Sequence, residues 1–110
     1  MPNKAEEYFR KNLKLEPDST GRLISLANFF IENNRKLNEV PELMDRAMKQ
    51  AKNKVDYYNY MNIKGWALYK AGKTKEAMEI LQKCWDEAPY KLYSIRSHYE
   101  EVKMAVGGLK

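Results

Sequence analysis

The fold is decided by residues 65–89, which read GWALYKAGKTKEAMEILQKCWDEAP. Two helix-favouring segments, rich in Ala, Leu, Glu, Lys and Met, flank Gly72, a residue type that commonly ends helices. Thr74 follows as the start signal of the second segment. Pro89 ends that segment, because proline disfavours helical geometry in the residue before it. The stretch therefore predicts two antiparallel helices joined by a short turn.

The same pattern extends over the whole chain, which has neither runs of β-branched residues nor a sustained alternation of period two. The expected fold class is therefore all-α. Six helices are predicted, over residues 3–15, 21–32, 39–52, 57–72, 75–88 and 91–106. The second is expected to take its N-cap from residues 18–20 and to end in left-handed geometry at 33–34, and the fourth to begin after Asp56.

An internal repeat links these helices. The third aligns with the fifth at a constant offset of 37 residues, through the pairs Val40–Ala77, Met44–Leu81 and Ala47–Cys84. The first aligns with the third at an offset of 35, through Ala5–Val40, Phe9–Met44 and Asn12–Ala47. Such a period is typical of helix pairs that cannot bury their apolar faces alone and stack to form a core.

With this period, the stretch quoted above resembles a tetratricopeptide repeat, whose units of ~34 residues carry a W-x2-L-G-x2-Y…A-x3-F…P pattern. Gly65, Gly72, Ala77 and Pro89 match at the expected spacing, whereas Lys64 stands where the pattern has leucine. The resemblance implies an α-solenoid of antiparallel helix pairs with a right-handed superhelix, a short array of the bacterial type.

In that phase the chain is one domain, 1–110, made of the second helix of a partial repeat (3–17), two repeats (21–52 and 56–89) and a capping helix (91–106). The first helix would lack its partner. We therefore expect either a piece of a longer protein or a chain that begins with a capping helix. The outward face of that helix, with Tyr8 and Phe9 or their neighbours, is expected to allow self-association.

The composition disfavours catalysis. The chain contains one cysteine, Cys84, and one histidine, His98, which is too few for a disulfide framework or a Cys- or His-rich metal site. We expect no enzyme activity, no cofactor and no metal, with Cys84 as a buried structural thiol and His98 as a partly exposed residue of the cap. No apolar run approaches the ~20 residues of a membrane span, so no membrane partner is expected.

The sequence leaves the compartment open. The N-terminus has no apolar segment of the signal-peptide kind, which would make the protein cytoplasmic if the chain is complete.

The charge pattern disfavours nucleic acid as a partner. Twenty Lys and Arg stand against 15 Asp and Glu, a net charge of +5, with no basic block. Nucleic-acid interfaces usually show clustered cations. Tyr57, Tyr58 and Tyr60 could stack on bases, but Lys54 and Lys64 are the only cations flanking them.

The resemblance implies that the first helix of each pair lines a concave surface holding an extended peptide or a partner helix. Asn62, Trp66 and Tyr69 share one helical face at i, i+4 and i+7. Amides can bond a peptide backbone, and Trp and Tyr give rigid contact area. The alternative is that Trp66 and Tyr69 belong to the core. The predicted partner-binding residues are Asn28, Glu32, Asn59, Asn62, Trp66, Tyr69, Lys70 and Arg96.

The expected function is a non-catalytic scaffold that binds a peptide or protein segment on its concave face. Two alternatives stay open: an accessory or docking domain at the C-terminus of a larger enzyme, and a helical repeat that binds nucleic acid. A steep dependence of binding on salt would favour the last, because phosphate contacts release counterions.

Overall fold

The computed structural model describes residues 2–89 and 93–107, and these ranges hold six α-helices and no strand. The all-α class is therefore confirmed. The helices are α1 (Pro2–Leu15), α2 (Thr20–Glu32), α3 (Val40–Lys49), α4 (Lys54–Lys70), α5 (Thr74–Glu87) and α6 (Tyr93–Gly107). A short 3-10 helix, η1 (Leu37–Glu39), precedes α3.

Local side chains and backbone geometry set the helix ends. Ser19 caps α2, with its hydroxyl accepting a hydrogen bond from the Arg22 amide at 3.4 Å. Asn34 leaves α2 in left-handed geometry, with φ of 49°, as predicted for residues 33–34. Gly72 ends the turn after α4 with φ of 87°, where a side chain would be strained.

Two of the predicted helices have wrong bounds. The fourth helix begins at Lys54 rather than after Asp56, because the Asn53 side chain is the cap and accepts from the Asp56 amide at 2.8 Å. The third helix ends at Lys49 rather than Lys52, and it begins at Val40 rather than at residue 39, which belongs to η1. For the sixth helix, predicted from residue 91, positions 91 and 92 lie outside the described residues.

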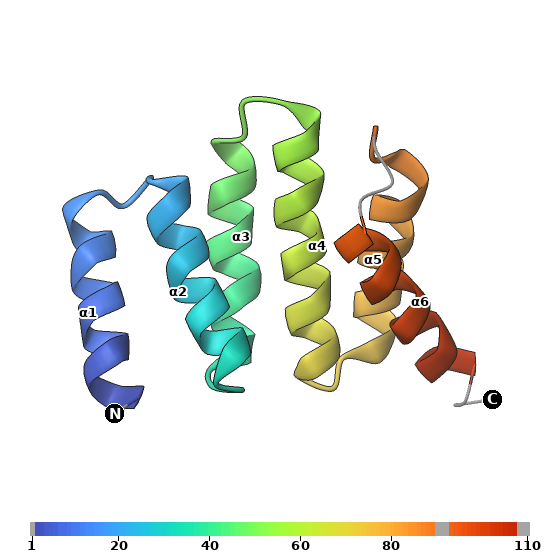
Figure 1. Cartoon of the computed structure of the whole chain (residues 1–110), viewed down its shortest axis with the longest axis horizontal. Coiled ribbons are helices and arrows are strands. Elements are labelled where there is room, and N and C mark those ends of the chain that lie inside the picture. The colour runs from blue at the N-terminus through green and yellow to red at the C-terminus, as the bar shows by residue number, and fades with distance from the viewer. Residues whose placement is uncertain (1, 90–92, 108–110) are drawn as a thin grey trace.

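Helices α1 to α5 stand side by side in chain order and alternate in direction, and α6 crosses in front of α5 at the end of the row away from α1 (Figure 1). Each helix packs on the next one along the chain. Among helices two apart, α2 approaches α4 and α4 approaches α6 with Cα atoms within 8 Å, whereas in the described ranges neither α1 and α3 nor α3 and α5 do so. The even-numbered helices are therefore closer together than the odd-numbered ones.

Small residues allow the closest helix approach, between α4 and α5. Gly65 lies on α4 against Leu81 and Ile80 of α5, and a β-carbon at position 65 would stand 2.8 Å from Leu81 Cγ. Ala77 and Cys84 are fully buried on the facing helix. The buried apolar residues fall into three clusters: one spans the first half and includes Leu23, Leu26, Phe30, Val40 and Met44, and two lie in the second half, with Ala77 in one and Cys84 in the other.

Candidate functional site

A polar and aromatic cluster joins α4 to α6. His98 on α6 lies flat against Trp66, with ring centroids 4.0 Å apart and an interplanar angle of 9°. Its Nδ1 lies 3.0 Å from Oδ1 of Asn62, one turn before Trp66 on α4. The Tyr69 ring also packs on Trp66, with ring centroids 5.3 Å apart, and Lys70 Nζ lies 5.5 Å from the Trp66 ring centre.

The protonation state of His98 follows from this position. Because an amide oxygen can only accept, the proton of the Asn62 bond resides on Nδ1, which leaves Nε2 as an acceptor. Burial of the ring, and to a smaller extent the nearby Lys70 ammonium, lower the His98 pKa to about 4. The ring is therefore neutral at pH 7, which suits a flat stack beneath an indole and a lysine.

The structure brings four of the predicted partner-binding residues together on α4, but in different environments. Asn62 is buried, at 3% exposure, and its Oδ1 is engaged by His98. Trp66 and Tyr69 are half-buried and pack on the core of the second half, and Lys70 is exposed. Trp66 and Tyr69 therefore combine features of a core residue and of a surface residue: one side of each ring packs inward, while part of each ring is exposed to solvent.

The other predicted partner-binding residues differ in exposure and in whether their side chains have a polar partner. Asn28 and Glu32 on α2 are exposed, Asn59 on α4 is half-buried, and none of the three has a polar partner among the described residues. Arg96 is exposed and paired with Glu100 at 3.1 Å. It lies some 160° around α6 from His98 by helical geometry, so the structure does not bring it to the Trp66 cluster.

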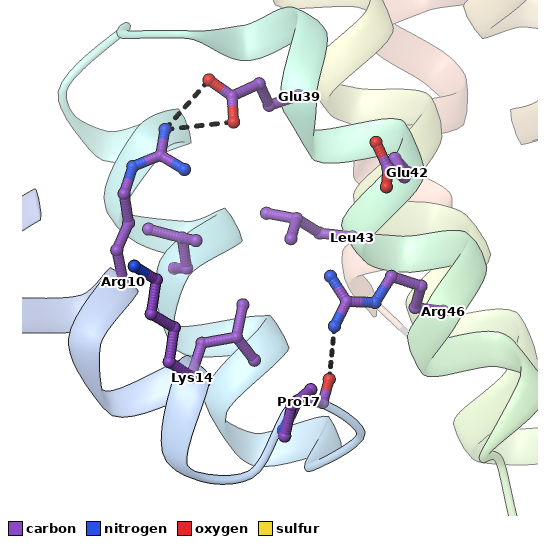
Figure 2. Close-up of a pocket in the computed structure, with 9 residues that line it drawn as sticks. Arg10, Lys14, Pro17, Glu39, Glu42, Leu43 and Arg46 are labelled. Atoms are coloured by element: carbon purple, nitrogen blue, oxygen red, sulfur yellow. Dashed lines mark hydrogen bonds and ion pairs between the residues drawn. The ribbon is translucent and has the colours of Figure 1, made fainter.

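A hollow of about 380 Å³ that sequence reasoning missed lies between α1, α2 and α3. Its floor is apolar, from Leu13, Leu26 and Leu43. Figure 2 shows Arg10 from α1 reaching across its rim to Glu39, with both carboxylate oxygens at 3.0 Å. The hollow lies where α1 and α3 have no Cα atoms within 8 Å of each other.

The rim of this hollow carries three cations, Arg10, Lys14 and Arg46, and two carboxylates, Glu39 and Glu42. Arg46 donates to the Pro17 carbonyl, Lys14 lies beside it on α1, and Glu42 on α3 faces the cavity region (Figure 2). The spacing of Arg10 and Lys14 at i, i+4, against Glu39 and Glu42 at i, i+3, was a signal in the sequence that these two helix faces are complementary.

Glu6 anchors α1 at the far end of the same interface. Its buried carboxylate accepts from Lys36 at 2.6 Å, Arg10 at 2.7 Å and Arg35 at 2.6 Å. Hydrogen bonds from Lys36, and then from Arg10, lower the Glu6 pKa to about 2. Lys36 adopts φ of 47°, so the loop between α2 and η1 is shaped to deliver two cations to one acid.

Among residues 2–89 and 93–107, no group of three or more His, Cys, Asp or Glu side chains could hold a metal ion. Cys84 is buried as predicted, and burial raises its thiol pKa to about 12, which suppresses the reactive thiolate. Within the same ranges no helix is both long and apolar enough to span a membrane.

No protein-family model matches this chain, and a search of curated proteins finds no match either.

Proposed function

We propose that this chain is a short α-solenoid of the tetratricopeptide type that binds an extended segment of another protein across α2, α4 and α6. The approach of α2 to α4 and of α4 to α6, without matching contacts among the odd-numbered helices, supports a row bent towards the even-numbered side. A row bent in that direction has its concave surface on those helices, where the resemblance expects the ligand.

One observation carries the proposal: α4 presents partly exposed aromatic rings beside unpaired polar side chains. Trp66 and Tyr69 supply rigid contact area, with Lys70 next to them. Asn59, two turns away on the same helix, has an amide with no partner among the described residues. Rings that bury area and amides that bond a backbone are the combination by which helical grooves hold extended peptides.

In this proposal the residues take different roles. Asn28, Asn59 and Glu32 contact the backbone and side chains of the peptide, because their polar groups have no partner within residues 2–89 and 93–107. Asn62 is a positioning residue: it bonds His98, and His98 supports the inner face of Trp66. The binding surface therefore rests on a buried hydrogen bond between α4 and α6, which keeps Trp66 in place before the ligand arrives.

The test starts from a random twelve-residue peptide library, selected against the immobilised protein. For the tightest peptide, Kd is measured by fluorescence anisotropy with the wild type and with Asn59→Ala, Tyr69→Ala and Lys70→Ala. Each substitution is expected to weaken binding by about 10-fold, or ~1.4 kcal/mol. Lys83→Ala, an exposed lysine on α5, is the matched control and should leave Kd unchanged.

Unchanged Kd values in all three variants would overturn the proposed surface. Trp66→Ala is read together with its melting temperature, since loss of the fold would mark Trp66 as a core residue only. A labelled single-stranded oligonucleotide that binds with a steep dependence on salt, while no peptide is selected, would instead favour the nucleic-acid alternative.

A further inference from the structure

Exposed apolar side chains in the described ranges are confined to the two terminal helices. The large hydrophobic residues left open to solvent are Tyr8 and Leu15 on α1, at 64% and 72%, and Tyr93 and Met104 on α6, at 85% and 78%. Helices α2 to α5 carry none of this kind. Single apolar residues scattered over a surface need no explanation, but here they are grouped at the two ends of the row, which is typical of an interaction surface.

The two terminal faces have the same spacing. On α1, residues 4, 8, 11 and 15 lie on one side of the helix, opposite the buried Glu6 and Leu13. On α6, residues 93, 97, 100 and 104 lie on one side, opposite the buried Ile95 and Val102. Both stripes follow i, i+4, i+7, i+11, and each has two large apolar residues among its four members. We call them the α1 stripe and the α6 stripe.

The polar members of the two stripes differ in charge. The α1 stripe contributes Lys4 and Lys11, which have no partner among the described residues. The α6 stripe contributes Ser97 and Glu100, and it lines a shallow hollow of about 480 Å³ together with Glu101, which forms no ion pair with any described residue. Glu100 is already paired with Arg96, but both groups are more than half exposed, so this carboxylate can accept a second cation.

The order of the residues fits an antiparallel pair. In Figure 1, α1 rises from the N-terminus and α6 descends, so placing the α1 end of one copy beside the α6 end of another continues the alternation of the row. The stripe spacing reads the same in both directions. Antiparallel alignment therefore sets Leu15 against Tyr93, Lys11 against Ser97 and Tyr8 against Glu100, with Lys4 against Met104.

We propose that the α1 stripe of one copy of this chain packs on the α6 stripe of a second copy, head to tail. The flanks agree with this pairing, because Glu7 beside the α1 stripe would face Lys103 beside the α6 stripe. Each copy keeps one free face of each kind, so the contact is heterologous and adds further copies until a ring closes or a filament forms. It does not depend on the proposed peptide-binding surface.

The test uses sedimentation velocity on the full chain over a range of concentrations. Two variants block one stripe each: Tyr8→Ser with Leu15→Ser on α1, and Tyr93→Ser with Met104→Ser on α6. These side chains are exposed, so both variants should fold, which circular dichroism checks. The wild type is expected to gain mass steadily with concentration, while each variant alone stays monomeric.

The decisive sample is an equimolar mixture of the two variants. Each retains the face that the other has lost, so a head-to-tail contact predicts a 1:1 dimer that grows no further. Self-association of either variant alone would show a like-with-like contact and overturn the proposal. So would a wild type that remains strictly monomeric at about 1 mM, which would leave these faces to a different partner. A control variant, Lys83→Ser, should behave as the wild type.

Discussion

In the α1–α3 half a buried carboxylate organises the packing, whereas in the α4–α6 half aromatic rings and a glycine do. Glu6 gathers Arg10, Arg35 and Lys36 and so ties α1 to the loop after α2. The other half has Gly65 against Leu81 and a neutral stack of His98 on Trp66. An ion-pair cluster is sensitive to the loss of a charge, whereas close-packed apolar contacts are sensitive to a change of volume. Different substitutions should therefore destabilise the two halves.

The largest effect is expected from adding volume in the second half. In Gly65→Val the new side chain would overlap Leu81, since even a β-carbon lies 2.8 Å from Leu81 Cγ, in a buried contact that cannot open to solvent. We expect a loss of about 3 kcal/mol or more in the free energy of unfolding, measured by urea denaturation. Gly21→Val is the matched control. It places a β-carbon no nearer than 4.0 Å to Ser19 Oγ on an exposed helix start and should cost far less.

Equal losses in the two glycine variants would mean that helix propensity, not the approach of α4 to α5, sets the cost. In that case close packing at Gly65 would not be what distinguishes the α4–α6 half.

The next effect belongs to the first half. Glu6→Gln keeps the size of the side chain but leaves Lys36, Arg10 and Arg35 around a neutral amide. We expect a loss of roughly 2–3 kcal/mol, concentrated in α1, because the ion pairs that dock this helix vanish together. Amide hydrogen exchange should show α1 opening while α4 stays protected.

Glu7→Gln is the control for that substitution, since Glu7 is the exposed neighbour and forms no ion pair in the described ranges. If the two glutamine variants unfold alike, the Glu6 cluster does not hold α1.

Titration should separate the halves by pH. His98 has its pKa lowered to about 4, so the unfolded chain takes up a proton near pH 6.5 while the folded chain does not. Stability is therefore complete at pH 7 and falls by about 2 kcal/mol as pH drops from 6.5 towards 4. Glu6, with its pKa lowered to about 2, contributes stability that is lost only below about 4.5.

A His98→Phe variant isolates the first of these steps. It retains a ring against Trp66 but cannot titrate, so the fall in unfolding free energy between pH 6.5 and 5 should disappear, although the variant is less stable throughout because Asn62 loses its partner. Persistence of the same slope would assign it to another group.

The outline of the fold was predictable because it depends on local signals, and the particular contacts were not because they depend on distant ones. The six helices and the left-handed exit at Asn34 follow from breakers and periodicity. The start of α4 was misplaced because Asn53 and Asp56 are both good caps, and only the geometry shows that Asn53 accepts the bond.

The candidate site was predictable to a smaller extent. Helical spacing placed Trp66, Tyr69 and Lys70 together, but it could not show that His98, 36 residues after Asn62, would bond this amide and stack on Trp66. Likewise, the three cations on Glu6 come from α1 and from the loop at residues 35–36. Contacts over such separations depend on how helices pack, which no local pattern encodes.

The smallest effect is expected where the halves meet. Lys64, which stands at an apolar position of the repeat pattern, places its Nζ 2.8 Å from Asp45 Oδ1 and so pairs α4 with α3. Asp45 is half exposed, so water competes for both groups and the pair should contribute only about 0.5 kcal/mol. A double-mutant cycle with Lys64→Met and Asp45→Ala measures this coupling.

Lys64→Met alone should stabilise the chain or leave it unchanged, because the lysine side chain is already three-quarters buried and methionine restores the apolar side chain of the pattern. A coupling above 2 kcal/mol would instead show that an ion pair organises this junction, as the Glu6 ion pairs organise the first half. In that case α4 would belong with the half whose packing depends on charge.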